Sequence, residues 1–226
     1  MSHPSEITVM VVMIGQTAYW PLTRPFIENY CERNGYVFRV FSEDCLPSDH
    51  HPSWNKLLVA SFAKTPHVLL WDADLVPLPW APPIHVDLGD RRMAAVRITP
   101  SSGGRRKLRA RYGREAAPQM TFNCGLISVP HKWKAFLRNL FFNANYDQSI
   151  FWEQGEFNRA VFDGEIKVDE LDSKWNCWVS SSLNNDYLNA NCLHFAKGSA
   201  RRLRNLGRLY KMLRESGRLP EWVYRC

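Results

Sequence analysis

The N-terminal part of the chain alternates strand-like and helix-like segments, and this alternation restricts the folds open to it. Residues 7–14 are almost continuously apolar and rich in β-branched side chains, as in a strand buried on both faces. A helical spacing of apolar residues follows and closes on Gly35, and residues 36–41 form a second strand-like run. Ser53 can cap a second helix, which leads to a third apolar run at 67–71. This βαβαβ order predicts an α/β fold whose parallel sheet carries helices on its faces.

The remainder of the chain is less regular. With 226 residues, the chain can build one well-packed core but hardly two, so we predict a single domain over 1–226. The stretch 99–118 is rich in Gly and Arg and is predicted as a long loop, a kind of segment that is usually functional or disordered. Apolar periodicity predicts further strands at 93–98, 122–129, 166–171 and 191–195, and helices at 131–142 and 147–162.

The charge of the chain is concentrated in two places. The formal net charge is +7, and the excess of basic residues lies at 105–114 and 201–218. Such clusters favour polyanions, which include nucleic acids, membrane surfaces and the phosphates of a small substrate. Charge alone does not choose among these partners.

Cysteine spacing and hydropathy indicate the compartment. The six cysteines show no CxxC spacing, which argues against a zinc cage or a small disulfide scaffold and favours reduced thiols. No apolar stretch reaches the length of a membrane span, and the N-terminal apolar run lacks the flanks of a signal peptide. We therefore predict a soluble, cytoplasmic protein.

Two aspartates follow the third predicted strand directly. Asp72 and Asp74 stand one residue apart at its carboxyl end, which is where open α/β sheets bind their ligands. Both carboxylates can turn toward a hard cation that neutralises a diphosphate. The alternative is a capped turn, in which the two side chains bind nearby backbone N–H groups.

The segment around these aspartates resembles a known group. Residues 53–79 are similar to the DxD region of retaining GT-A glycosyltransferases, both the glycogenin and bacterial galactosyltransferase group (family 8) and the GMA12/MNN10 group (family 34). The resemblance implies a Rossmann-like nucleotide-diphospho-sugar transferase fold with a mixed, mostly parallel sheet flanked by helices. It also implies that Lys56 lies near the nucleotide sugar.

Further matches follow in the order of these families. The run FNCG resembles the strand that lines the donor and acceptor pocket, which makes Asn123 and Gly125 candidates. The run WEQGEFNRAV resembles a segment whose carboxylate lies by the anomeric carbon, which gives Glu153 and Gln154 as the catalytic pair. The alternative is that Glu153 is an exposed helix residue beside a core face formed by Trp152 and Phe157.

The run LHFAKG resembles the late segment that carries the third protein ligand of the metal, which is His194 here. The resemblance implies that Lys197 and Gly198 lie by the diphosphate. The glycine is displaced relative to family 8 and the Pro-Trp that ends the family segment is missing, so Lys197, Arg201 and Arg202 all stay open as the diphosphate-binding cation.

Together, the resemblance implies an enzyme that moves a sugar from a UDP-sugar to a glycan or another hydroxyl acceptor, with retention of configuration favoured over inversion. Asp72, Asp74 and His194 would hold Mn²⁺, or Mg²⁺ if the imidazole is dispensable. Asp72 also belongs to the donor site. Residues 7–98 would form the nucleotide-sugar half and 119–198 the acceptor and catalytic half, and 199–226 a basic C-terminal helix. The loop 15–20 would contact the base.

Some choices remain open from the sequence. Other carboxylates compete with Glu153, namely Asp147, Glu156, Asp169 and Asp172. Among nine tryptophans, Trp175 and Trp178 are candidates for exposed rings that stack on an acceptor sugar, although large aromatics are more often core residues.

Two other functions compete with sugar transfer. Paired aspartates also hold metals in nucleases and polymerases, so a nucleic-acid enzyme or a basic nucleic-acid-binding domain is the alternative. Against it, the basic segments match no common nucleic-acid-binding motif. The basic C-terminal helix could also contact a membrane surface peripherally, or its leucines could pack on the domain.

Overall fold

The computed structural model describes residues 3–15, 17–46, 50–99, 101–115, 121–146, 151–179, 185–196 and 198–219. Its centre is a six-stranded sheet in the order β2-β1-β3-β6-β5-β7. β1 pairs in parallel with β2 and β3, β5 pairs in parallel with β7, and β6 runs antiparallel between β3 and β5. The predicted mixed, mostly parallel sheet is confirmed. The strands are β1 (Ile7–Val12), β2 (Val37–Phe41), β3 (His67–Asp72), β5 (Met93–Arg97), β6 (Phe122–Pro130) and β7 (Val168–Leu171).

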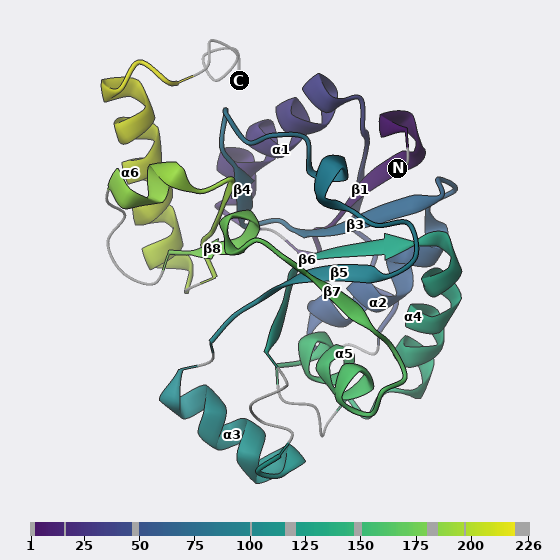
Figure 1. Cartoon of the computed structure of the whole chain (residues 1–226). Helices are drawn as coiled ribbons and strands as arrows, with labels where there is room; N and C mark the ends of the chain where they lie inside the picture. The colour runs from purple at the N-terminus through teal and green to yellow at the C-terminus, as the bar shows by residue number, and fades with distance from the viewer. Residues whose placement is uncertain are drawn as a thin grey trace.

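Helices cover both faces of this sheet (Figure 1). Alternate residues of β1 point to opposite faces: Val9 and Val11 pack into the core beneath α1 (Trp20–Asn34), whereas Met10 packs into the core beneath the other helices. These are α2 (Asn55–Val59), α4 (His131–Asn143) and α5 (Glu153–Phe162). Burial on both faces explains why the strands read as continuous apolar runs.

A second, three-stranded sheet joins distant parts of the chain. Its order is β4 (Leu75–Pro77), β9 (Cys192–His194) and β8 (Cys177–Trp178). β4 follows the two aspartates, and its antiparallel pairing with β9 places Leu75 opposite His194. This register carries a histidine from late in the chain to the aspartates at the end of β3.

The predicted loop at 99–118 is wrong over much of its length, because Ser102–Tyr112 form helix α3. The Ser101 side chain caps it by accepting a hydrogen bond from the N–H of Gly104 at 3.2 Å. Leu108 is the buried residue of this helix, so its sequence lacks the apolar stripe that normally predicts one.

The C-terminal basic segment forms helix α6 (Ser199–Glu215), which packs on the domain. Leu206, Leu209 and Leu213 are buried in a third core cluster together with residues of α1, β4 and β9. The apolar face of α6 is thus occupied by the protein, and the membrane-surface alternative receives no support. Among the described residues, no helix combines the length and the apolar character needed to cross a bilayer.

Candidate active site

A cavity of about 660 Å³ lies at the carboxyl ends of β1 and β3, where Val12 and Asp72 line it. Because β1 and β3 are parallel, their ends meet at the same edge of the sheet. The first turn of α3 borders the cavity through Gly104, and the start of α6 borders it through Gly198. Segments from several parts of the chain therefore line the same cavity.

Three side chains form a compact cluster on the cavity wall. Potential ligand atoms of Asp72, Asp74 and His194 all lie within 4.8 Å of one another. The Nε2 atom of His194 is 3.5 Å from Oδ2 of Asp72 and 3.4 Å from Oδ1 of Asp74. Asp74 and His194 are buried, and Asp72 is half-buried. Two carboxylates and one imidazole are a donor set that suits a divalent metal ion.

A chain of amide groups fixes the orientation of the histidine ring. The N–H of Gly125 donates to Oδ1 of Asn123 at 2.8 Å, which identifies this atom as the acceptor. Nδ2 of Asn176 donates to the same oxygen at 2.6 Å, so Oδ1 of Asn176 faces Nδ1 of His194 at 2.7 Å. The N–H therefore lies on Nδ1 of His194, and Nε2 is the ring atom that faces the two aspartates.

Gly125 leaves room for this histidine. A Cβ atom at Gly125 would lie 2.6 Å from Cε1 of His194 and 2.8 Å from Oδ1 of Asn123. Any larger residue would push the ring or the amide out of place. The glycine is thus required by close packing rather than by its backbone angles.

Arg202 brings a cation from α6 into the cluster. Its guanidinium lies 2.9 Å from Oδ2 of Asp74 and over the ring of Tyr19 at 4.2 Å, and its Nε donates to the carbonyl of Phe195. Burial alone would raise the pKa of Asp74, but His194 and Arg202 outweigh burial and lower it. Asp74 is therefore held as a carboxylate.

Lys56 joins two carboxylates on the opposite side of the cluster. Its Nζ lies 2.6 Å from Oδ1 of Asp72 and 2.7 Å from Oε1 of Glu153, and it donates to the carbonyl of Cys124 at 3.2 Å. Burial would lower the pKa of Lys56, but the two carboxylates outweigh burial and raise it. This buried ammonium is therefore charged and fully paired.

Glu153 is 3% exposed, so its interpretation as an exposed helix residue is wrong. Its Oε2 atom is buried and has no hydrogen-bond partner within the described residues. Gln154 follows it and accepts from Nδ2 of Asn123 at 3.0 Å and from the N–H of Cys124 at 3.2 Å. Since buried polar atoms are normally satisfied, the free Oε2 indicates a place for a donor from a ligand.

The backbone before Glu153 is strained. Phe151 and Trp152 have φ of 66° and 54°, a region that costs bulky residues on the order of 1–3 kcal/mol each. The helix predicted at 147–162 begins at Glu153, and residues 147–150 lie outside the described part of the chain. Trp152, expected in the core, is 48% exposed and stacks on the ring of His51 at 3.7 Å.

The described competing carboxylates do not line the cavity. Glu156 pairs with Arg159 at 2.9 Å and Asp169 with Arg92 at 3.1 Å. Asp172 accepts from the N–H of Lys174 at 2.8 Å, so it serves as a helix cap. Asp147 lies outside the described residues.

The two candidate tryptophans differ. Trp175 is fully buried and donates to Oδ2 of Asp87, so its expected exposure to sugar is wrong. Trp178 is 39% exposed, lines the cavity and lies edge-on to the ring of His194 at 5.7 Å. It is the ring of this pair that a ligand can reach.

Of the open cations, Arg202 lines the cavity, Arg201 is exposed outside it, and Lys197 is outside the described residues. Sequence reasoning missed Asn176 altogether, and no spacing in the sequence marks it. Sequence reasoning also missed Tyr19 as an individual residue, although it predicted that the loop 15–20 contacts the base.

Comparisons with known proteins identify the fold of this chain. No protein-family model and no curated protein sequence matches the chain. Solved structures do: a glycosyltransferase involved in glycosylation of the major capsid of PBCV-1 is 17% identical, with a TM-score of 0.68, over 89% of this chain and 98% of that one. The galactosyltransferase LgtC is 15% identical, with a TM-score of 0.58, over 89% and 95% of the two chains. GlyE of Streptococcus pneumoniae is 16% identical, with a TM-score of 0.55, over 96% and 64%.

The chain therefore has the GT-A fold of these glycosyltransferases. At such identities the likeness establishes the fold alone, and the activity has to be argued from the site.

Proposed function

We propose that this protein is a metal-dependent glycosyltransferase that transfers a sugar from a UDP-sugar to a hydroxyl of a glycan acceptor. The observation that carries the proposal is the cluster of Asp72, Asp74 and His194 in a cavity that also holds the Lys56–Glu153 pair. A GT-A fold with such a cluster at the carboxyl edge of its sheet suits a nucleotide diphosphate bound through a cation.

Asp72, Asp74 and His194 would hold the cation, Mn²⁺ or Mg²⁺, which supplies positive charge to the departing diphosphate when bound. Around it, Arg202 and the first turn of α6 at Gly198 border the cavity. A helix N-terminus and a guanidinium both favour phosphate oxygens. Lys56 is committed to Asp72 and Glu153, so its proposed part is to fix these carboxylates beside the donor.

The nucleoside end has a proposed place along the loop after β1, where Thr17 and Tyr19 line the cavity. Asn123 and Gly125 also line this cavity. Their amide network supports the sugar-binding side, because Gln154 is held by Asn123 directly behind Glu153.

Sugar transfer breaks the bond between the anomeric carbon and a diphosphate oxygen, which leaves with the electron pair. A bond forms from the acceptor oxygen to the same face of the anomeric carbon, and the proton of the acceptor hydroxyl passes to the departing diphosphate oxygen. The free Oε2 of Glu153 can accept a hydrogen bond from a sugar hydroxyl at this point. We propose Glu153 as the catalytic carboxylate and retention as the outcome, and NMR of the anomeric configuration of the product distinguishes retention from inversion.

The acceptor has a proposed platform in Trp178. Sugar faces are apolar and stack on aromatic rings. Trp178, together with Ile98 and Thr99, also borders a second cavity of about 400 Å³. An acceptor longer than one sugar unit can thus extend from the first cavity past Trp178 into the second.

Thermal unfolding with UDP and Mn²⁺ tests the proposal, followed by hydrolysis of a panel of UDP-sugars. We expect UDP to raise the midpoint only when Mn²⁺ is present, and EDTA to abolish the effect. Asp74→Asn should abolish it too, whereas Asp163→Asn, an exposed carboxylate outside the cavity, should not. If UDP and Mn²⁺ together do not change the unfolding midpoint of the unmodified protein, the proposal is contradicted.

The position of His194 is tested by a pair of glycine variants. Gly125→Ala should displace the ring and weaken Mn²⁺ binding by about 10–100-fold, the range for lost orienting contacts. Gly207→Ala is the control, since a Cβ there meets no atom within 4 Å. Equal Mn²⁺ affinity in both variants would contradict the part given to His194.

A further inference from the structure

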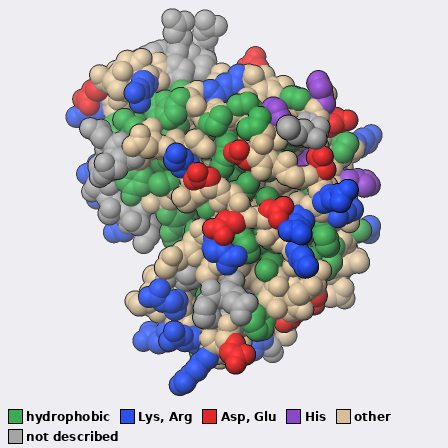
Figure 2. Space-filling model, viewed as in Figure 1, with side chains coloured by type: hydrophobic (Ala, Val, Ile, Leu, Met, Phe, Trp, Pro, Cys, Tyr) green, Lys and Arg blue, Asp and Glu red, His purple; other side chains and the backbone are tan. Residues whose placement is uncertain are grey.

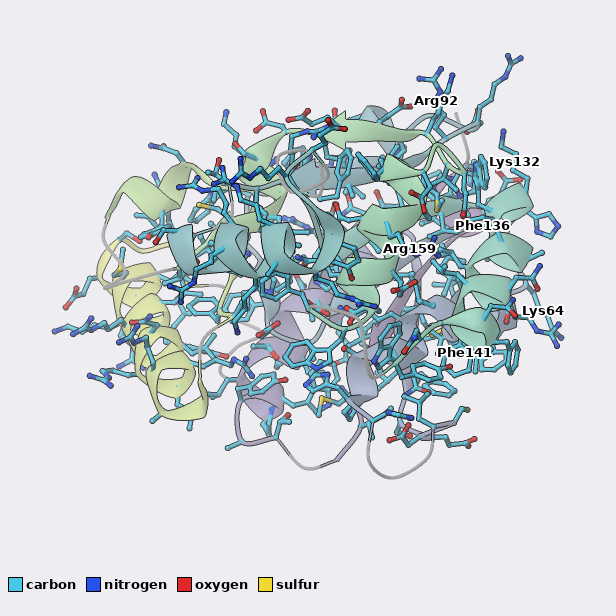
Figure 3. All side chains as sticks on the ribbon, turned by 90° about the horizontal axis from the view of Figure 1, so that it is seen from below. Lys64, Arg92, Lys132, Phe136, Phe141 and Arg159 are labelled. Carbon is cyan, nitrogen blue, oxygen red and sulfur yellow. The ribbon has the colours of Figure 1, made fainter. Side chains whose placement is uncertain are left out.

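Helix α3 carries a cationic surface that the proposed sugar transfer does not use. Its exposed basic residues are Arg105, Arg106, Lys107, Arg109 and Arg111, and it contains no acidic residue. Figure 2 shows Lys and Arg side chains gathered over this helix at the lower left, and in Figure 3 nitrogen-tipped side chains extend from it.

The surface stands at the mouth of the active-site cavity. Gly104 and Leu108, one helical turn apart, line the cavity together with Ser101. Leu108 also packs against Phe151, two residues before Glu153. The inner face of α3 is thus part of the cavity wall, and its basic side chains lie on the remaining faces, beyond the rim.

Four of these five basic residues form no ion pair in the part of the chain that the structure describes. Arg105, Arg106, Lys107 and Arg109 have no carboxylate partner among the described residues. The carboxylates of the cavity are already paired with Lys56 and Arg202. These cations of α3 can therefore bind an anionic ligand without first breaking an ion pair within the described part of the protein.

The arrangement carries an energetic cost in the free protein. Arg105 and Arg109, and likewise Lys107 and Arg111, are like charges four residues apart, a spacing at which like charges destabilise a helix. Gly103 and Gly104 weaken the first turn further. A bound anion would offset this repulsion.

We propose that α3 is the docking surface for an anionic acceptor, an oligosaccharide that carries repeated sulfate, phosphate or carboxylate groups. The inference rests on the proposed function and names the acceptor class of that same site. A ligand that reaches both the cavity and the outer faces of α3 must extend beyond the donor, and the acceptor is the substrate that enters through the mouth.

Two other polyanions fit the surface less well. Single-stranded nucleic acids need aromatic stacking platforms, and the aromatic residue of α3, Tyr112, packs against Leu108 instead. A membrane-surface helix needs an apolar face to insert, and the apolar residue of α3 is buried. An oligosaccharide requires neither feature.

The experiment measures fluorescence anisotropy with a labelled heparin octasaccharide and, as its neutral match, labelled maltooctaose. The test variant Arg106→Gln/Lys107→Gln/Arg109→Gln removes three charges from α3 while keeping residues of good helix propensity. The control Arg204→Gln/Arg208→Gln/Arg214→Gln removes three exposed charges from α6. A third variant, Arg106→Lys/Arg109→Lys, keeps the charge of α3.

We expect the heparin octasaccharide to bind and maltooctaose to bind far more weakly. The α3 variant should weaken heparin binding by about tenfold or more, because each lost cation removes one counterion-release contact. The α6 control should change it by less than about twofold, and the lysine variant should retain it.

The proposal would be overturned if the α3 and α6 variants lost the same amount of heparin affinity, or if the protein bound maltooctaose as tightly as heparin. It would also be overturned if a 20-nucleotide DNA or phosphatidylglycerol vesicles bound more tightly than heparin and this binding depended on α3. Loss of the UDP and Mn²⁺ response in the α3 variant would assign the helix to the donor and also overturn it. Absence of that response in the unmodified protein contradicts the proposed function instead, so the two failures are distinguishable.

Discussion

Helices α3 and α6 are both strongly basic, and both border the same cavity, but they are built differently. α6 buries Leu206, Leu209 and Leu213 against a core cluster shared with α1, β4 and β9. α3 buries Leu108 in a small cluster with Tyr112 and Phe151. In Figure 1, α6 lies beside β4 and β8, whereas α3 stands away from the central sheet.

The difference shows that a run of basic residues has no fixed structural meaning. In α6 the leucines recur at helical spacing, so one face is committed to the core and directs Arg202 onto Asp74. In α3 the arginines occupy every face but one and are left for solvent or a ligand. The apolar residues between the charges decide which case applies. Four predictions test the contrast, from the largest expected effect to the smallest.

Leu209→Ala in α6 should lower the free energy of unfolding by about 2–5 kcal/mol, the range for a leucine deleted from a packed core. Urea unfolding followed by circular dichroism measures it. Leu203→Ala, at a half-buried position of the same helix, should cost less. Equal losses would mean that α6 is not anchored through its buried face.

Arg202→Gln should reduce UDP-sugar hydrolysis by about 100-fold or more, the effect of removing one donor from a preorganised site. Arg204→Gln, an exposed neighbour on α6, is the matched control and should keep the rate. If both variants retain full activity, α6 contributes only to packing, and the two helices do not differ in their contribution to catalysis.

Leu108→Ala should release α3 while the rest of the domain stays folded. The expected loss of global stability is smaller than that of Leu209→Ala, because Leu108 belongs to a small cluster outside the main cores. Hydrogen exchange measured by mass spectrometry should show faster exchange at 102–112 only. A global loss equal to that of Leu209→Ala would show that α3 is part of the core.

Salt should act on the two helices in opposite directions by a few tenths of a kcal/mol, the size of single charge pairs on helices. Screening relieves the repulsion within α3, but it weakens the Lys211–Glu215 pair of α6, which lies at 3.7 Å. Exchange at 102–112 should therefore slow between low and moderate salt, and exchange at the end of α6 should not. If exchange changed in the same direction in both helices, charge repulsion within α3 would not distinguish it from α6.

Much of the fold followed from local patterns. The strands were predicted because burial on both faces demands continuous apolar residues, and α1 ends at the expected Gly35, which adopts φ of 70°. α3 was missed because one buried leucine leaves no periodic signal. Trp175 was misjudged because sequence does not tell a core tryptophan from an exposed one.

The candidate residues were chosen by motif order, and their roles stay predictions. The structure brings Lys56, Asp72, Asp74, Asn123, Gly125, Glu153, Gln154, His194 and Gly198 to one cavity. Asn176, directly before β8, and Arg202, on α6, join them through contacts that no local pattern encodes, since each contact depends on how its segment packs against the rest of the domain.

The sequence by itself determined the βαβαβ alternation and the position of Asp72 at the end of a buried strand, because strand burial and strand ends are local properties of the chain. Only the tertiary structure decided that His194, Glu153 and Arg202 meet these aspartates. Each arrives through a long-range contact, namely the pairing of β4 with β9, the Lys56–Glu153 ion pair and the docking of α6. Such contacts depend on the packing of the whole domain, which no single segment specifies.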